Sequence, residues 1–205
     1  MKNPWEKIYR EGKFDMEPHL EIETVAEELT QNNSRRILDL GCGTGRQLIY
    51  LASKGLDLYG LDSSPTGLMI MLKELYKRNL SAHIALHDMT ELPYENNFFD
   101  AVISVQVIHH NKVKDIKKTI KEICRILRDD GIIWITVPAV KNEPSTRQTE
   151  IEPGTFVPLD GEEEGLIHHY FKKSELLLLL GNFKIIDFHI DRSNHFSILA
   201  RKVSG

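Results

Sequence analysis

Cysteine and long apolar runs are both scarce in this chain of 205 residues. The two cysteines, Cys42 and Cys124, lie far apart and form no CxxC pair, so they indicate reduced thiols more than a disulfide framework. The longest apolar runs, such as Leu68–Leu72 and Leu176–Leu180, are far shorter than the about 20 residues that span a bilayer. The N-terminus is too polar to be the core of a signal peptide. We therefore expect a soluble, cytoplasmic protein with no membrane partner.

An excess of positive charge is also lacking. The chain has 26 Lys and Arg against 30 Asp and Glu, a net charge of −4, whereas proteins that grip a phosphate backbone usually carry a basic excess. A nucleic-acid partner is therefore disfavoured unless a partner subunit supplies the basic surface. The hydrophobic fraction of 41%, without repeats or low-complexity tracts, is near that of globular proteins, and the length predicts one domain over 1–205.

Short β-branched runs alternate with helical patterns along residues 18–138. This alternation predicts parallel β-α-β units and an α/β, Rossmann-like, doubly wound sheet with helices on both faces. Ligands of such sheets bind beyond the carboxyl ends of the strands. The first of these helices is expected to open at Pro18 and to include Leu20 among its apolar residues. The expected strands are 36–40, 58–62, 82–86, 99–105 and 132–137, and further helices are expected to begin near Gly45, Ser64 and Val113.

The regular alternation ends after Pro138. Residues 139–172 form a long polar stretch, whose acidic part at 150–165 is either a cap over an acceptor site or a solvated surface loop. A short helix over 173–180 leads to two β-patterned runs, 183–190 and 196–202, joined by a hairpin-like turn. The last strand is therefore expected to run antiparallel.

A glycine-rich loop follows the first expected strand. Gly41, Gly43 and Gly45 allow a tight turn and a close approach of the backbone to a ligand. The G-x-G-x-x-G fingerprint of dinucleotide folds is not met, because the sixth position is Arg46. Asp39, two residues before the first glycine, would repel a pyrophosphate but suits an ammonium group. Since Asp62 at the end of the second strand can accept hydrogen bonds from a ribose diol, the loop favours a cationic nucleoside over a dinucleotide.

These residues resemble the class I S-adenosylmethionine-dependent methyltransferases of the small, single-domain type 11/25 kind. The family carries D-L-G-C-G-T-G after its first strand, which matches Asp39–Gly45, and an acid that matches Asp62. Asp88-Met89 resembles the adenine-binding segment, Phe98–Ser104 the fourth-strand motif, and 127–131 the turn before the fifth strand. The resemblance implies seven mostly parallel strands, S-adenosylmethionine as cofactor and S-adenosylhomocysteine as product. The cofactor contacts that it implies are Asp39, Gly41, Cys42, Gly43, Gly45, Asp62, Ser63, Asp88, Met89, Ser104 and Val105.

The N-terminal segment also has a counterpart in this family. Trp5 and Tyr9, followed by Gly12, resemble a short lid of small methyltransferases, including the tellurite-resistance type, in which both aromatic rings would cover the cofactor. The alternative is an amphipathic helix that packs Trp5 and Ile8 on the core. With the lid at 1–34, the cofactor half occupies 35–138, the acceptor cap 139–172, and the last helix and hairpin 173–205.

Histidines gather where the methyl acceptor is expected. His109 and His110 follow the fourth strand, and His168 and His169 end the polar stretch, while His19 and His87 also fall on ligand-side segments. Because histidine titrates near neutrality, the first four are candidate general bases or acceptor contacts. The alternative is that they pack, cap or face solvent. A metal site would need three or four convergent ligands, so no metal is expected.

Two classes of acceptor remain open. The leading hypothesis is methyl transfer to a small molecule, by a monomer or homodimer. The segment 167–176 also resembles small methyltransferases that modify either tRNA wobble uridines or metabolites. The alternatives are a tRNA or protein methyltransferase that works with a partner subunit, and a non-catalytic S-adenosylmethionine-binding module; a nicotinamide reductase is disfavoured by Arg46.

Overall fold

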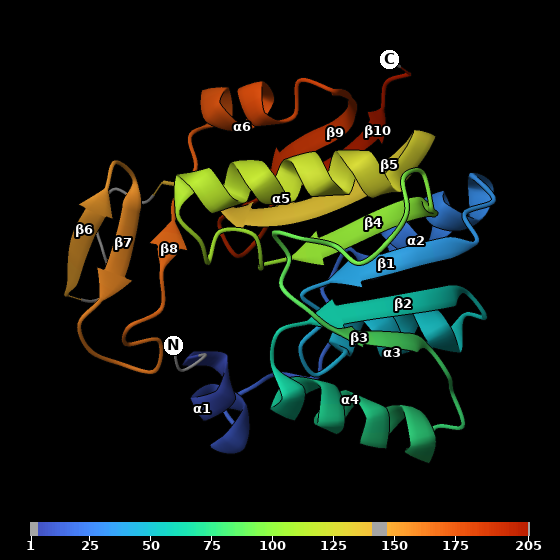
Figure 1. Ribbon diagram of the computed structural model, residues 1–205, viewed down its shortest axis with the longest axis horizontal. Coiled ribbons are helices and arrows are strands. Elements are labelled where there is room, and N and C mark those ends of the chain that lie inside the picture. The colour runs from blue at the N-terminus through green and yellow to red at the C-terminus, as the bar shows by residue number, and fades with distance from the viewer. Residues whose placement is uncertain (1–3, 141–146, 205) are drawn as a thin grey trace.

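A twisted sheet forms the centre of the molecule, which a computed structural model describes over residues 4–140 and 147–204 (Figure 1). Its strand order is β3-β2-β1-β4-β5-β10-β9, and β10 runs antiparallel to both of its neighbours, as the sequence predicted. The other neighbouring strands pair in parallel. The strands are β1 (Arg36–Leu40), β2 (Asp57–Asp62), β3 (His83–Leu86), β4 (Phe99–Val105), β5 (Leu127–Pro138), β9 (Phe183–Ile190) and β10 (His195–Lys202).

Helices cover both faces of this sheet, as the doubly wound prediction required. The apolar residues of α2 (Ile22–Gln31), α3 (Arg46–Ser53) and α4 (Pro65–Lys77) pack in one core cluster. Those of α5 (Val113–Ile126) and α6 (Lys173–Leu179) pack in the other, in front of the sheet in Figure 1. Within the described residues, no helix is both long and apolar enough to cross a membrane.

Two element boundaries differ from the prediction. The helix expected to open at Pro18 begins only at Ile22, and Leu20 lies outside it with 76% of its surface exposed. Leu20 lies two positions before Ile22, the first residue of the buried stripe, and is out of phase with that stripe. Strand β5 already pairs at Leu127 with Phe99 and resumes at Ile132 with Ala101, so 128–131 form an irregularity rather than a plain turn.

The polar stretch after Pro138 contains a second sheet, which the sequence did not predict. Its strands are β6 (Gln148–Glu152), β7 (Thr155–Pro158) and β8 (His168–His169), all antiparallel, in the order β6-β7-β8. Figure 1 shows this small sheet beyond the carboxyl ends of the parallel strands, on the same edge as α1 (Pro4–Arg10). The backbone N–H of His169 donates to His109 O at 2.9 Å, which ties β8 to the loop after β4.

Candidate active site

The glycine loop connects β1 to α3 beyond the carboxyl end of the sheet. Gly41 and Gly43 have φ angles of 74° and 52°, a region that residues with a Cβ rarely adopt. A Cβ on Gly41 would collide with the side chain of Val107, and one on Gly43 would lie 2.5 Å from the Tyr9 hydroxyl oxygen. Gly45 is the N-cap of α3. The loop therefore needs glycine for its shape and for the close approach of other groups.

Asp62 holds this loop against the start of α4. Its Oδ2 accepts from the Gly43 N–H and its Oδ1 from the Ser64 N–H, both at 2.8 Å. Ser64 itself is the N-cap of α4, since its hydroxyl accepts from the Gly67 N–H at 3.1 Å. Ser64, and not Asp62, therefore caps this helix. Burial raises the pKa of Asp62, and the backbone donors Ser64, Gly43 and Ser63 partly oppose this effect.

Asp39 lies beneath the same loop with 2% of its surface exposed. Its Oδ2 is buried and has no hydrogen-bond partner among the described residues. Burial, and then the nearby charge of Asp62, raise the pKa of Asp39 to about 7. A buried carboxylate with an unsatisfied oxygen is stabilised by a cationic group. The loop thus suits the cationic cofactor that the sequence resemblance implies.

The remaining predicted cofactor residues occupy different environments. Asp88 is exposed after β3, and its Oδ1 accepts from both the N–H and the hydroxyl of Thr90. Met89 beside it is partly buried, while Ser63 is exposed at the end of β2. Cys42 and Val105 are buried, as is Ser104, whose hydroxyl donates to Leu40 O at 3.2 Å.

Helix α1 lies over the glycine loop and the start of α4. The Tyr9 side chain lies against both Gly43 and Gly67. A Cβ added to Gly67 would lie 2.9 Å from Tyr9 Cε2, so only glycine leaves room for the ring there. Trp5 stacks on Tyr9 with ring centroids 5.9 Å apart and meets His110 edge-on at 4.8 Å. A lid over the cofactor and a helix packed on the core, the two roles considered for this segment, are thus compatible in space. Ile8 is buried, whereas the Tyr9 ring lies against the glycine loop and Trp5 contacts His110.

Glu6 anchors α1 and was not identified from the sequence. Its Oε1 accepts from the Ser64 hydroxyl at 2.5 Å and from the Thr66 N–H at 3.1 Å, and its Oε2 accepts from the Thr66 hydroxyl at 2.6 Å. These hydrogen bonds lower the pKa of Glu6, those from the two side chains most strongly. In the sequence, only its place next to Trp5 marks Glu6, because the partners of Glu6, Ser64 and Thr66, lie about 60 positions away.

Three of the four candidate histidines come together at the carboxyl edge. Ring centroids lie 3.9 Å apart for His109 and His110, 4.7 Å for His110 and His168, and 5.8 Å for His109 and His168. Burial, and then the neighbouring imidazoles, lower the pKa of His109 and bring that of His110 to about 3. Both side chains are therefore neutral at physiological pH.

His169 points away from this group. Its Nδ1 lies 2.7 Å from the Thr155 hydroxyl and its Nε2 lies 3.0 Å from Glu175 Oε1. Both ring nitrogens thus link β8 to β7 and to α6. This arrangement leaves His169 no ring nitrogen for a substrate, although its backbone positions its neighbour His168.

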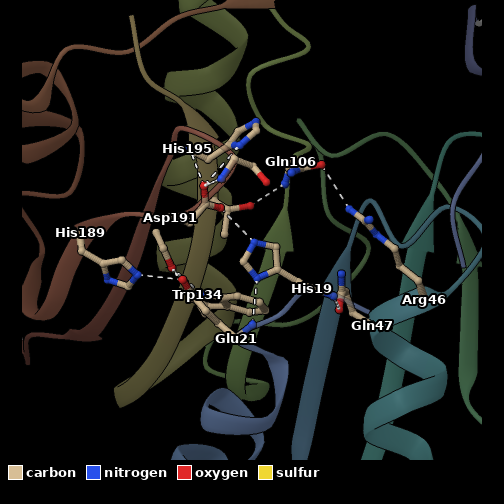
Figure 2. A network of polar contacts seen from close by, with 12 residues as sticks. His19, Glu21, Arg46, Gln47, Gln106, Trp134, His189, Asp191 and His195 are labelled. Atoms are coloured by element: carbon tan, nitrogen blue, oxygen red, sulfur yellow. Dashed lines mark hydrogen bonds and ion pairs between the residues drawn. The ribbon is translucent and has the colours of Figure 1, made fainter. Parts of the chain in front are cut away.

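His19 belongs to a separate polar network (Figure 2). His87 is exposed. His19 Nε2 lies 3.1 Å from Asp191 Oδ2, and its ring meets the edge of Trp134. Glu21 extends the network, because it accepts from Ser197, which in turn accepts from Trp134 Nε1. These contacts join the N-terminal segment to the turn between β9 and β10, which is a structural function.

Comparison with known proteins agrees with this architecture. A family model described as a methyltransferase domain matches residues 38–135. The tRNA (carboxymethyluridine(34)-5-O)-methyltransferase of Arabidopsis thaliana is 32% identical over 122 residues, which cover 57% of this chain and 27% of that protein. Matches to the curated relatives span between 25% and 54% of their own length.

Solved structures share the fold at lower identity. A methyltransferase from Methanosarcina mazei has a TM-score of 0.77 at 23% identity, over 88% of this chain and 98% of that one. The 1,6-didemethyltoxoflavin-N1-methyltransferase of Burkholderia thailandensis, with 1,6-didemethyltoxoflavin and S-adenosylhomocysteine bound, has a TM-score of 0.73 at 17% identity, over 97% and 85%. Residues 38–135 thus match a methyltransferase domain, and the chain shares its fold with solved S-adenosylmethionine-dependent methyltransferases.

Proposed function

We propose that the chain transfers the methyl group of S-adenosylmethionine to a small-molecule acceptor at the carboxyl edge of the sheet. The acceptor atom forms a bond to the methyl carbon while the carbon–sulfur bond breaks, and its electron pair stays on sulfur in S-adenosylhomocysteine. Such an in-line displacement needs alignment of the two reactants and exclusion of water. A reduced, cytoplasmic setting belongs to this proposal, since both cysteines are free thiols.

The cofactor is assigned to the glycine loop because the carboxylates around the loop carry negative charge and can accept hydrogen bonds from it. Asp39 faces the ammonium group, Asp62 accepts from the ribose diol, and Asp88 with the Met89 N–H receives the adenine. Support comes from the buried, unsatisfied oxygen of Asp39 and from the fixed carboxylate of Asp62. Trp5 and Tyr9 then cover the cofactor, and Tyr9, which contacts Gly43, shares the loop surface with it.

The acceptor is assigned to the space near His109, His110 and His168. The observation that carries the choice of a small molecule is the charge of the second sheet at this edge. Six acidic residues lie within 147–169, the segment that forms this sheet and its connections, against one basic residue, Arg147, which pairs with Asp160. The six are Glu150, Glu152, Asp160, Glu162, Glu163 and Glu164. An acidic rim repels a phosphate backbone, whose neutralisation supplies most of the affinity of nucleic-acid binding.

A tRNA acceptor is the second candidate, and one observation favours it. The relative from Arabidopsis thaliana is named as a tRNA methyltransferase and is 32% identical over 122 residues. With a net charge of −4, this chain would need a partner subunit to supply the basic surface. A protein acceptor that is presented by a partner would meet the same requirement.

Direct binding of tRNA separates these alternatives. We expect the isolated chain, with S-adenosylhomocysteine present, to show no saturable binding to labelled bulk tRNA at physiological salt by fluorescence anisotropy. Ordinary non-specific binders have dissociation constants of about 10⁻⁴–10⁻⁶ M under such conditions. The triple charge reversal of Glu162, Glu163 and Glu164 to lysine is the control, because it should introduce salt-dependent binding. Low-micromolar binding by the unmodified chain would instead favour tRNA.

A further inference from the structure

We propose that His109, His110 and His168 together bind a divalent transition-metal ion. Each offers one ring nitrogen, and these three atoms all lie within 4.8 Å of one another. In the sequence the three belong to two pairs about 60 positions apart, so their convergence is a property of the fold alone. Small side-chain rotations bring such nitrogens to the about 2.0–2.1 Å that separates zinc from an imidazole ligand.

The backbone holds the two contributing segments together. His109 and His110 lie in the short loop after β4, and His168 lies in β8. The His169 N–H donates to His109 O at 2.9 Å, directly beside the cluster. The side chain of His169 adds rigidity through Thr155 and Glu175. The three imidazoles are thus presented by fixed elements, which a preformed metal site requires.

The hydrogen bonds around the rings suit metal ligation. Nδ1 of His110 lies 3.0 Å from Ile167 O, to which it donates, so Nε2 carries the free lone pair. A ligating histidine commonly donates its other ring N–H to a backbone carbonyl in this way. Nδ1 of His109 is buried and has no hydrogen-bond partner among the described residues. Such an atom costs free energy unless another group satisfies it, and a bound cation would do so.

The donor set indicates the class of ion. Imidazole nitrogen suits zinc, copper, nickel and ferrous iron, whereas magnesium and calcium prefer oxygen ligands. Glu163 Oε2 lies 3.5 Å from Nε2 of His168 and supplies a negative charge close to the site. Three protein nitrogens leave at least one position of a tetrahedral ion open, as in catalytic zinc sites.

The site lies next to the lid, because Trp5 meets the His110 ring edge-on at 4.8 Å. This step rests on the proposed function: the open position takes an oxygen or sulfur atom of the acceptor. Coordination favours loss of the acceptor's proton to water, and the freed lone pair then attacks the methyl carbon. The acceptor class is accordingly a hydroxyl, carboxyl or thiol compound, and no imidazole has to accept the proton.

Metal titration tests the site without any methyl acceptor. Tag-free protein stripped with EDTA is titrated with Co²⁺ while visible absorption is recorded, and Zn²⁺ is then added as competitor. We expect one Co²⁺ per chain, displaced by Zn²⁺, and a loss of affinity of at least about 100-fold in H110N and in H168N. His83→Asn is the matched control, since this exposed histidine contacts Asp57 and Tyr59 and lies outside the cluster.

S-adenosylhomocysteine binding, measured on each protein, shows that the variants are folded, because none of the three histidines is among the proposed cofactor contacts. Absence of stoichiometric Co²⁺ binding by the wild-type chain would overturn the proposal. So would unchanged Co²⁺ affinity in H110N and H168N that still bind S-adenosylhomocysteine. Failure to bind S-adenosylhomocysteine would count against the proposed function, whereas failure to bind metal counts against this site alone.

Discussion

The Asp62→Ala variant is expected to bind S-adenosylmethionine about 100-fold more weakly than the wild type, or worse. That factor corresponds to about 2.7 kcal/mol of binding free energy. The substitution removes the proposed ribose acceptor and also releases the N–H groups of Gly43 and Ser64, which Asp62 now holds at 2.8 Å. Hydrogen bonds to a charged group contribute about 1.5–3 kcal/mol each, so the loop itself should lose order. Isothermal titration calorimetry with S-adenosylmethionine and S-adenosylhomocysteine measures the effect.

Asp57→Ala is the matched control for this variant. Asp57 begins the strand that Asp62 ends, so it lies at the opposite edge of the sheet, where it is exposed. We expect its cofactor affinity to match that of the wild type within a factor of about three. Unchanged affinity in Asp62→Ala would show that the carboxylate neither contacts the cofactor nor shapes its loop. Tight binding of NADH in place of S-adenosylmethionine would contradict the assignment of the loop itself.

Cofactor affinity is expected to rise with pH up to about 7 and then level off. Burial and the charge of Asp62 raise the pKa of Asp39 to about 7, so the group is mostly neutral below that pH. A cationic ligand favours the carboxylate, and each pH unit below 7 should therefore weaken binding by up to about tenfold. Binding at pH 6 should release a proton, which appears in calorimetry as a dependence of the heat on the buffer.

The stability of the cofactor-free protein should show the opposite trend. The pKa of Asp39 is higher in the folded than in the unfolded chain, so its contribution is fully present below the unfolded pKa of about 3.9. It is lost as pH rises through about 7. In Asp39→Asn we expect a flat pH profile of cofactor affinity, with near wild-type binding at pH 6 and weaker binding at pH 8. A pH profile in Asp39→Asn that still matches the wild type would assign the titration to another group.

The cofactor half was predictable because its signals are local. A buried strand, three glycines and a capped helix follow one another within 36–77, and each depends on the preferences of its own residues. The Ser64 cap and Pro65 fix the start of α4 in the same way. Leu20 shows that apolar character alone does not place a residue in a helix, since it lies out of phase with the buried stripe, outside the helix and exposed.

One reason explains why neither the second sheet nor the histidine cluster could be predicted from the sequence. Strand β6 is largely exposed, so no alternation of apolar and polar residues marks it, and β8 has two residues. Their positions depend on contacts with the loop after β4, such as the hydrogen bond from His169 to His109. Glu6 likewise became recognisable only through Ser64 and Thr66. Contacts between distant segments are invisible to a local pattern.

Transfer of labelled methyl groups tests the central claim most directly. The protein is incubated with methyl-labelled S-adenosylmethionine and either the low-molecular-mass fraction of a cell extract or bulk tRNA and protein from the same cells. We predict that label enters the low-mass fraction, that S-adenosylhomocysteine forms in equal amount, and that Asp62→Ala abolishes both. Label confined to tRNA or protein, or no transfer by a chain that binds the cofactor tightly, would contradict methyl transfer to a small-molecule acceptor.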